Sequence, residues 1–371
     1  MRALRYYGRE DVRLEEVPQP VLERPEDAIV RVTTTSVCGT DLHPYRGTRY
    51  KPEGALLGHE AVGLVESVGA SVKHVKPGDR VLVPSVIGCG FCAYCTQGVG
   101  SQCQAPGAGT LQGAQAEFVR VPWANASLVR LPDGLTDEAA LTLADAFPSG
   151  YFGVQQAEVR PGNAVAIFGA GPVGLFAMKA AQMAGATRIY AVDHDLDRLD
   201  LAAREGFHPL DLMGEPPVQA ILALTGGHGV DAAIEAVGMD AINPDGERDP
   251  GVAARWCLEA VKPAGRVAIL GAFSQPIDAF PLHLALERNV SIRGGVANVR
   301  TLVQPLLAML QQGRFDPTFV YTGAIDFEDI EHGYRQFDRH EHIKVIVRTE
   351  AGREQMDKKS ARFGVTRVSW T

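Results

Sequence analysis

Four of the chain's six cysteines lie within fifteen residues, and their spacing suits a metal ion. Gaps of two, two and seven residues separate Cys89, Cys92, Cys95 and Cys103. Four thiolates this close can fill every position around one tetrahedral zinc ion, with Zn–S bonds of about 2.3 Å. Because a filled site leaves no open position for a substrate, we predict a structural zinc here.

The alternative for these cysteines is disulfide pairing in a secreted protein. The first ten residues contain no apolar signal core. The longest uncharged apolar run, residues 164–178, is too short to span a bilayer and is broken by glycines and a proline. We therefore expect a cytoplasmic chain, and the reduced thiols of that compartment favour metal over disulfides.

A second set of candidate ligands, Cys38, His59 and Glu60, lies outside this loop. A catalytic zinc takes three protein ligands and keeps one position open. Cys38 and His59 supply two, and Asp145 is the third, because an acid beside the apolar residues 139–143 needs an explanation. One thiolate, one neutral imidazole and one carboxylate carry a charge of −2, which balances zinc. The alternatives are a core cysteine, a surface histidine and, for Asp145, a helix cap.

The elements that must position these residues change in character along the chain. Residues 1 to about 130 predict short strands rich in β-branched residues, at 12–17, 27–34, 61–68, 80–84 and 117–121. A helix is predicted after Thr136, a suitable N-cap followed by two acids. Beyond residue 295 we expect helices at 301–312 and 327–337 and a strand at 343–347. The polar residues from Thr349 onward are expected to be partly mobile.

Between these regions, short apolar strands alternate with helices, which predicts a doubly wound parallel sheet. The strand at 165–168 runs into a glycine motif, and an acid follows the last glycine by nineteen residues, as dinucleotide binding requires. The candidate cofactor-binding residues are Gly169, Gly171, Pro172, Val173, Gly174, Asp193 and Arg198. Asp193 would accept hydrogen bonds from the ribose hydroxyls and repel a 2′-phosphate, which favours NAD, whereas Arg198 could bind that phosphate. The alternative is a purely structural turn.

These patterns predict an α/β protein with two domains. Residues 1–150 and 297–371 form a β-rich zinc-binding domain, and residues 151–296 form a Rossmann dinucleotide-binding domain. The chain has 371 residues, of which 46% are hydrophobic and 22% charged, as in ordinary globular proteins. Its formal net charge is −8, which argues against nucleic acid or an anionic membrane as a partner.

Together these motifs resemble those of the zinc-dependent medium-chain alcohol dehydrogenases over nearly the whole chain. The matching segments are Cys38-Gly39-Thr40-Asp41-Leu42-His43, Gly58-His59-Glu60 with Gly63, the four-cysteine loop, and the glycine motif with Asp193. The family most often uses a second cysteine where this chain has Asp145. That departure is similar to the formaldehyde-dehydrogenase-like branch.

The resemblance implies a GroES-like catalytic domain, two zinc ions per chain, NAD, and hydride transfer between the cofactor and an alcohol or hydrated aldehyde. It implies that Thr40 accepts the alcohol proton and passes it through the nicotinamide ribose to His43 and solvent. Asp41 matches the carboxylate that orients the histidine ligand, and Glu60 is expected behind the metal as a transient ligand. Homodimers and homotetramers both occur in the family.

Other residues carry weaker expectations. Phe147 and residues 111–115 are candidate pocket walls, the strand at Gly294-Gly295 is a candidate subunit interface, and Cys257 is expected in the core. Two rival functions remain: a polyol or threonine-type dehydrogenase of the same superfamily, and a non-catalytic zinc and NAD sensor. Two zinc ions per chain would favour an enzyme, and one would favour the sensor.

Overall fold

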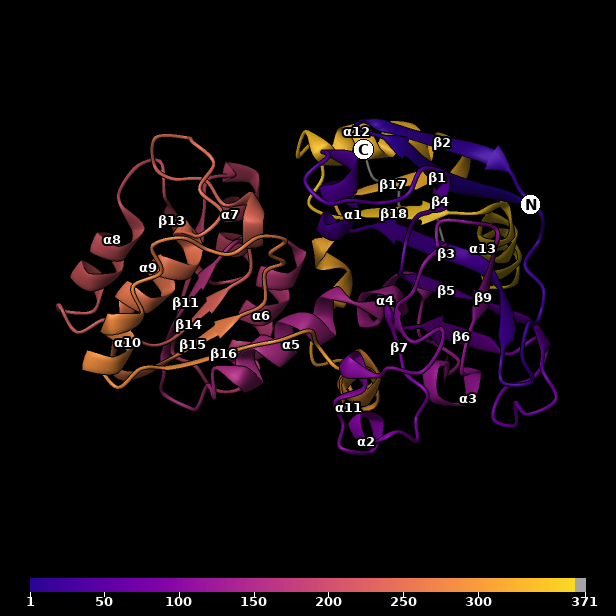
Figure 1. Cartoon of the computed structure of the whole chain (residues 1–371), viewed down its shortest axis with the longest axis horizontal. Helices are drawn as coiled ribbons and strands as arrows, with labels where there is room; N and C mark the ends of the chain where they lie inside the picture. The colour runs from indigo at the N-terminus through magenta and orange to yellow at the C-terminus, as the bar shows by residue number, and fades with distance from the viewer. Residues whose placement is uncertain (364–371) are drawn as a thin grey trace. The chain divides into compact units, whose positions relative to one another are not determined.

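The structure, a computed structural model, describes the backbone of residues 1–363 and the side chains of residues 1–356. The chain folds into two compact units (Figure 1). One comprises Met1–Pro148 together with the segment from Asn298 onward, and the other comprises Ser149–Ala297.

The contiguous unit is built on a six-stranded parallel sheet in the order β13-β12-β11-β14-β15-β16, the doubly wound order expected for dinucleotide binding. Its strands are β11 (Ala164–Phe168), β12 (Arg188–Asp193), β13 (His208–Asp211), β14 (Val230–Glu235), β15 (Val261–Ile269) and β16 (Ser291–Gly294). Its helices are α5 (Ala146–Gln156, shared with the end of the first segment), α6 (Pro172–Met183), α7 (Leu196–Arg204), α8 (Pro217–Leu224), η3 (Gly238–Asp240), α9 (Val252–Ala260) and α10 (Leu282–Glu287). Every side chain of β11 is buried, because helices cover both faces of a parallel sheet. Cys257 lies in this core, as predicted.

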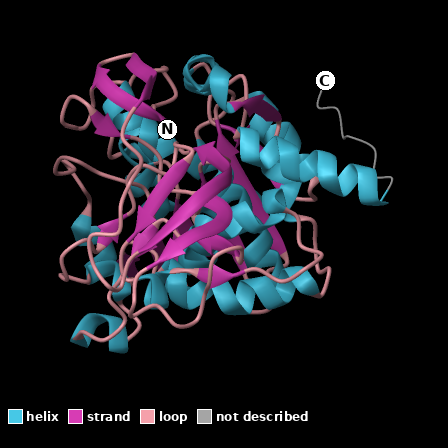
Figure 2. Cartoon of the chain, turned by 90° about the vertical axis from the view of Figure 1, so that its right-hand side faces the viewer, coloured by secondary structure: helices cyan, strands magenta, loops and turns pink. Residues whose placement is uncertain are grey.

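The discontinuous unit is β-rich, and its strands lie at its centre in Figure 2. Its main sheet runs β10-β6-β5-β3-β18-β17, with β9 also pairing with β3, and two smaller sheets are β2-β1-β4 and β7-β8. The strands are β1 (Arg2–Gly8), β2 (Asp11–Glu16), β3 (Ala28–Val37), β4 (Ala55–Leu56), β5 (Ala61–Val68), β6 (Arg80–Val83), β7 (Val86–Ile87), β8 (Gly109–Thr110), β9 (Phe118–Val121), β10 (Val129–Arg130), β17 (Gly323–Asp326) and β18 (Val345–Arg348). The late strand β18 pairs antiparallel with β3, so the end of the chain completes the sheet begun at its start. The predicted fold class, a β-rich domain plus a doubly wound parallel sheet, is confirmed.

Helices connect these strands, and several of them carry residues of the candidate site described below. They are α1 (Gly39–Tyr45), α2 (Ala93–Thr96), η1 (Gly100–Gln102), α3 (Ala124–Ser127), α4 (Asp137–Leu141), η2 (Thr142–Ala144), α11 (Val299–Gln311), η4 (Pro317–Val320), η5 (Phe327–Asp329), α12 (Ile330–Asp338) and α13 (Glu350–Phe363). Thr136 caps α4 as predicted, since its side chain accepts a hydrogen bond from the Ala139 amide. Within residues 1–363, none of the helices combines the length and apolar character needed to cross a bilayer.

The polar tail that begins at Thr349, expected to be partly mobile, starts with the helix α13. Thr349 is buried, donates its hydroxyl to the Val32 carbonyl oxygen at 2.6 Å and accepts the Gly352 amide, as an N-cap does. A Cβ on Gly352 would overlap the Thr33 carbonyl oxygen, so glycine lets the helix lie directly on β3. Residues 364–371, the rest of the predicted mobile tail, lie outside the described residues.

Candidate active site and metal centres

Three of the predicted ligands meet at one point of the discontinuous unit. Cys38 follows β3 as the N-cap of α1, His59 lies between β4 and β5, and Asp145 lies between η2 and α5. Asp145 Oδ2 lies 3.4 Å from His59 Nε2 and 3.5 Å from Cys38 Sγ. A tetrahedral zinc with ordinary bond lengths separates such N/O and S/O ligand pairs by about 3.4 and 3.6 Å. The donor set therefore fits a zinc ion in both chemistry and spacing.

The electrostatics of this group follow from its burial and its partners. Burial raises the pKa of the Cys38 thiol, and the neighbouring Asp145 carboxylate adds to that rise. Burial also opposes ionisation of Asp145, but hydrogen bonding and charge from His59 bring its pKa below the usual value. Ser85 donates its hydroxyl to Asp145 Oδ1 at 3.0 Å and leaves Oδ2 for the ligand position. A cation bound here must displace the Cys38 proton, so its affinity rises with pH.

Glu60 also belongs to this group, but its carboxylate is held from behind. Lys344, on the loop leading into β18, donates to Glu60 Oε1 at 2.9 Å, and Ser36 donates to Oε2 at 2.7 Å. Glu60 and Lys344 side chains are each only 1% exposed, so their charges are compensated mainly by each other. His59 Nε2 lies 4.0 Å from Glu60 Oε1. The structure therefore places a paired carboxylate next to the three ligands.

Asp41 lies on the other side of the imidazole. Its Oδ1 is 3.3 Å from His59 Nδ1, and its Oδ2 accepts the Cys38 amide at 3.0 Å. Burial opposes its charge, but the charge of His59 and hydrogen bonds lower the pKa of Asp41 overall. An ionised Asp41 keeps a proton on Nδ1, so Nε2, which faces Asp145, is the nitrogen that a metal ion would bind.

Thr40 and His43 both lie on α1. Thr40 is exposed, and its hydroxyl lies 3.4 Å from Cys38 Sγ, next to the ligand group. His43 is buried, and its carbonyl oxygen accepts the Thr48 hydroxyl at 3.0 Å. A hydroxyl that reaches the ligand cluster from the solvent side can meet a substrate there.

The sulfur atoms of the four-cysteine loop lie at the distances from one another that a bound zinc ion requires. Cys89 and Cys95 sulfurs are 3.9 Å apart, and those of Cys92 and Cys103 are 3.8 Å apart. Tetrahedral Zn–S₄ geometry requires about 3.8 Å between sulfurs. All six cysteines of the chain lie in the described part and are free, so the disulfide alternative is not realised here. The Cys95 amide lowers the pKa of Cys92 to about 7, which eases thiolate formation at one ligand.

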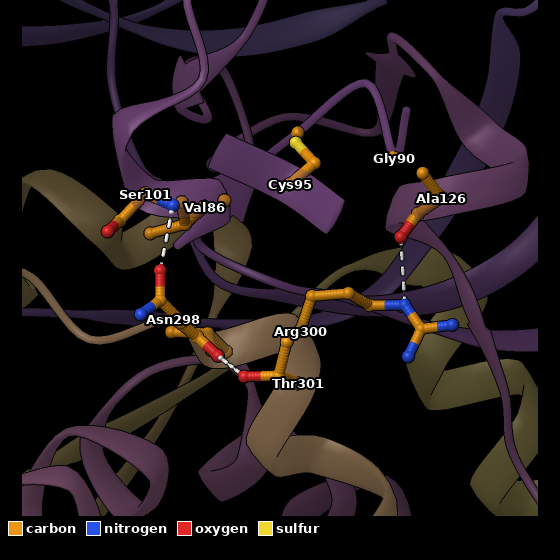
Figure 3. Close-up of a pocket in the computed structure, with 11 residues that line it drawn as sticks. Val86, Gly90, Cys95, Ser101, Ala126, Asn298, Arg300 and Thr301 are labelled. Atoms are coloured by element: carbon orange, nitrogen blue, oxygen red, sulfur yellow. Dashed lines mark hydrogen bonds between the residues drawn. The ribbon is translucent and has the colours of Figure 1, made fainter. Parts of the chain in front are cut away.

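The start of α11 contacts the four-cysteine loop and the nearby helix α3 (Figure 3). Asn298 Oδ1 accepts the Ser101 amide at 2.9 Å, and Arg300 Nε donates to the Ala126 carbonyl oxygen at 2.8 Å. These residues and Cys95 line a cavity of about 80 Å³. The Ser101–Asn298 hydrogen bond joins the loop to α11, so loss of the loop's zinc should lower the stability of this region without removing the whole fold.

Replacing Cys103 with serine should lower the zinc content by one ion per chain and reduce the free energy of unfolding by about 1–3 kcal/mol, the usual range for a local defect. Metal analysis and urea unfolding measure the two effects. The control is Cys257→Ala, a core cysteine outside the loop, which should leave the zinc content unchanged. Equal zinc content in the two variants would contradict the structural assignment.

In the contiguous unit, the glycine motif turns directly from β11 into α6. Gly169 has φ +98°, and a Cβ on Gly174 would overlap the Gly169 carbonyl oxygen, so both positions require glycine. Gly171 is the N-cap of α6, and Pro172 and Val173 form its first turn. The amides of this helix start are available for a phosphate.

Asp193 ends β12 beside this turn and is 4% exposed. Its Oδ2 accepts the Ala170 amide at 2.7 Å, and its Oδ1 accepts the His194 amide at 2.8 Å. Arg198 Nη1 lies 3.7 Å from Asp193 Oδ2. Burial opposes ionisation, but Arg198 and the backbone amides together lower the pKa of Asp193. Arg198 therefore faces an acid, which reduces its attraction for a phosphate.

Sequence reasoning missed several residues that surround the ligands, Ser36, Ser85, Tyr334 and Lys344, and gave Gln115 a different place, as a pocket wall. A lysine within the apolar stretch 343–347 was a readable signal, because a buried cation needs a partner. The expected pocket walls Phe147 and Gln115 are instead fully buried. Phe147 packs edge-on against Phe315, with ring centroids 5.3 Å apart, and Gln115 hydrogen-bonds Asp41.

Comparison with known proteins shows the family to which the chain belongs. The family model for the alcohol dehydrogenase GroES-like domain matches residues 24–133, and that for zinc-binding dehydrogenases matches residues 172–312. A probable zinc-binding alcohol dehydrogenase of Mycobacterium tuberculosis is 37% identical, over 90% of this chain and 84% of its own. The chain belongs to the zinc-dependent medium-chain alcohol dehydrogenases. It is a zinc-dependent oxidoreductase acting on alcohols, with zinc and NAD(H) as the cofactors of the family.

A solved relative of this alcohol dehydrogenase supports the same assignment. The alcohol dehydrogenase TADH from Thermus sp. ATN1 superposes with a TM-score of 0.83 at 37% identity, covering 94% of this chain and all of the other. The narrower formaldehyde-dehydrogenase-like branch has only loose support. A glutathione-independent formaldehyde dehydrogenase of Pseudomonas aeruginosa is 32% identical, over 91% of this chain and 94% of its own. The comparisons therefore support the superfamily rather than that branch.

Proposed function

We propose that Cys38, His59 and Asp145 hold a catalytic zinc, that the four-cysteine loop holds a structural one, and that the enzyme transfers hydride between an alcohol or hydrated aldehyde and NAD. The observation that carries this proposal is the ligand spacing around Asp145, which fits zinc. In this proposal residues 1–150 and 297–371 form the catalytic domain and residues 151–296 the dinucleotide-binding domain. Two zinc ions per chain follow from the two ligand groups.

A bound zinc would act as a Lewis acid toward the substrate oxygen and lower the pKa of the alcohol. The side chains of the chain perform the remaining work. Thr40 Oγ1, exposed beside Cys38 Sγ, accepts the proton that leaves the alcohol, and His43 on the same helix takes it toward solvent. Asp41 holds the His59 ring in its ligand orientation. Glu60 lies next to the group and would have to leave its Lys344 or Ser36 partner to act as a transient ligand.

The experiment that tests this function is the initial rate of NADH formation by purified, zinc-replete protein, with a parallel metal analysis. Primary alcohols, secondary alcohols, polyols, threonine and formaldehyde form the substrate panel. Turnover with primary alcohols or formaldehyde supports the proposal, and turnover confined to polyols or threonine favours the alternative dehydrogenase. Protein with one zinc and no turnover with NAD or NADP would favour a sensor instead.

Preference for NAD over NADP is the second part of the proposal, and it rests on Asp193. Replacing Asp193 with alanine should shift the ratio of kcat/KM values toward NADP by about 10- to 100-fold, because hydrogen bonds to a charged group are worth about 1.5–3 kcal/mol. It also removes one of the two acids beside Arg198, whose Nε still lies 3.5 Å from Asp195 Oδ2. Initial rates with both cofactors measure the ratio. Asp197→Asn, at an exposed position of α7, should leave the ratio unchanged. An unchanged ratio in Asp193→Ala would contradict the assignment.

We further propose a homodimer or homotetramer in a reducing, cytoplasmic setting. The strand β16 is the edge of its sheet, and Gly294 and Gly295 at its end are exposed. Nearby on the chain, Leu282 and Leu286 of α10 are 66% and 82% exposed. An open strand edge and exposed leucines favour association. Light scattering distinguishes the monomer, dimer and tetramer.

A further inference from the structure

A buried hydrogen-bonded chain leads from α12 to the imidazole of His59. Tyr334 of α12 donates its hydroxyl to Gln115 Oε1 at 2.7 Å. Gln115 Nε2 donates to Asp41 Oδ2 at 3.2 Å, and Asp41 Oδ1 faces His59 Nδ1 at 3.3 Å. Gln115 and Tyr334 have no exposed surface, and neither has been given a role in the reaction above.

The amide of Gln115 has only one satisfactory orientation. Its two N–H groups point to Asp41 Oδ2 and to the Ser36 carbonyl oxygen, which is 3.0 Å away. A carbonyl oxygen and an ionised carboxylate can only accept hydrogen bonds, so a flipped amide would place oxygen against oxygen. The Tyr334 hydroxyl then occupies the remaining carbonyl oxygen of Gln115. The Tyr334 hydroxyl therefore fixes the orientation of the Gln115 amide, and that amide holds Oδ2 of Asp41 by a hydrogen bond.

Gln115 also packs directly against the segment that carries His59. Its backbone amide donates to the Leu57 carbonyl oxygen at 3.0 Å, and the Ala114 amide donates to the Gly58 carbonyl oxygen at 3.0 Å. Gly58 has φ +84°, and a Cβ on it would overlap the Gln115 side chain. The glycine of Gly58-His59-Glu60 thus allows the close approach of Gln115 to this segment.

We propose that Gln115 and Tyr334 are positioning residues for the metal ligand His59 and act through Asp41. This inference rests on the proposed catalytic zinc site. With Oδ2 committed to Gln115 and to the Cys38 amide, Asp41 presents Oδ1 alone to the imidazole, which fixes the ring and the proton on Nδ1. Loss of the Tyr334 hydroxyl frees the amide to reorient and weakens this restraint without removing a ligand.

The chain offers a matched control for the tyrosine. Tyr321 belongs to the same unit and is likewise buried, at 2% exposure. Its hydroxyl has no hydrogen-bond partner among the described residues. Tyr321→Phe removes a buried hydroxyl, as Tyr334→Phe does. Of these two hydroxyls, that of Tyr334 is the one bonded to the Gln115 amide.

The test measures zinc release from the intact enzyme to a chromogenic chelator, together with the visible spectrum after cobalt substitution. Tyr334→Phe should speed release from the catalytic site by about 3- to 10-fold, the worth of one hydrogen bond. Gln115→Met should speed it by about 10- to 100-fold, as for other partners of metal ligands. Tyr334→Phe and Gln115→Met should both alter the visible absorption band of cobalt at the catalytic site. Neither should change the rate of zinc release from the four-cysteine loop. Tyr321→Phe should change neither the band nor the release rates.

Two results would overturn the inference: equal release rates for Tyr334→Phe and Tyr321→Phe, or equal acceleration at both zinc sites, which would indicate general loosening. His59→Ala separates this failure from failure of the proposed site. Loss of one zinc in that variant supports the ligand assignment on which the inference depends. Two retained zinc ions would show that His59 is not a ligand, and the inference would fall with the site.

Discussion

Replacing Asp145 with alanine should lower kcat/KM for alcohols by at least about 100-fold, because even the outer partners of metal ligands are worth 10- to 100-fold. The substitution removes the carboxylate oxygen that lies within 3.5 Å of both Cys38 and His59. Two ligands, one of them neutral, then hold zinc poorly. Zinc content should therefore fall toward one ion per chain.

A matched variant tests whether the effect is loss of a ligand. Asp145→Cys restores an anionic donor of the type that the family most often uses, so it should keep two zinc ions and retain more activity than alanine. Asp145→Asn keeps the size but loses the charge and should lie between them. Metal analysis beside steady-state kinetics measures each case. If Asp145→Ala kept two zinc ions per chain and full activity, the assignment of Asp145 as a ligand would be wrong.

Replacing Lys344 with methionine should cost about 3–5 kcal/mol of unfolding free energy, the usual effect of removing one partner from a buried ion pair. The reason is local. Glu60 is 1% exposed, and without the ammonium group its carboxylate keeps one hydrogen bond from the described side chains, that of Ser36, with His59 4.0 Å away. Urea unfolding of the zinc-loaded protein measures the loss.

A double substitution separates charge from packing in that result. Adding Glu60→Gln to Lys344→Met removes the stranded charge, so the double variant should be more stable than Lys344→Met alone. Lys344→Arg keeps the cation and should be the mildest of the three. If Lys344→Met lowered the free energy of unfolding by less than about 1 kcal/mol, the Lys344–Glu60 pair would be no stronger than a surface salt bridge, and the predicted effect of its burial would be wrong.

The sequence was informative wherever chemistry and spacing are local. Four cysteines within fifteen residues, and a glycine motif between an apolar strand and a helix, predict their structures directly because neighbouring residues build them. The same holds for the Thr136 N-cap. The parallel sheet followed from apolar strands that alternate with helices.

The residues that sequence reasoning missed act across long separations. Lys344 and Glu60 are 284 positions apart, and Tyr334 and Gln115 are 219 apart. No local pattern connects such partners, because β18 and α12 return to the N-terminal sheets only in the folded chain. The helix α13 was missed for another reason. Its polar composition suggested mobility, although Thr349 followed by Glu350 is a readable helix start.

The late position of β18 also sets an order of events during synthesis. Residue 145 completes the catalytic ligand set, and residue 344 follows 199 positions later (344 − 145). At 5–20 residues per second, roughly 10–40 s separate them on the ribosome. During that interval Glu60 lacks its ammonium partner, and the whole of Ser149–Ala297 is synthesised before Tyr334 and Lys344 appear. The nascent chain would thus hold all three proposed zinc ligands, with Asp41 and Ser85 beside them, before Tyr334 and Lys344 exist, so the full set of contacts around the site would form only after residue 344.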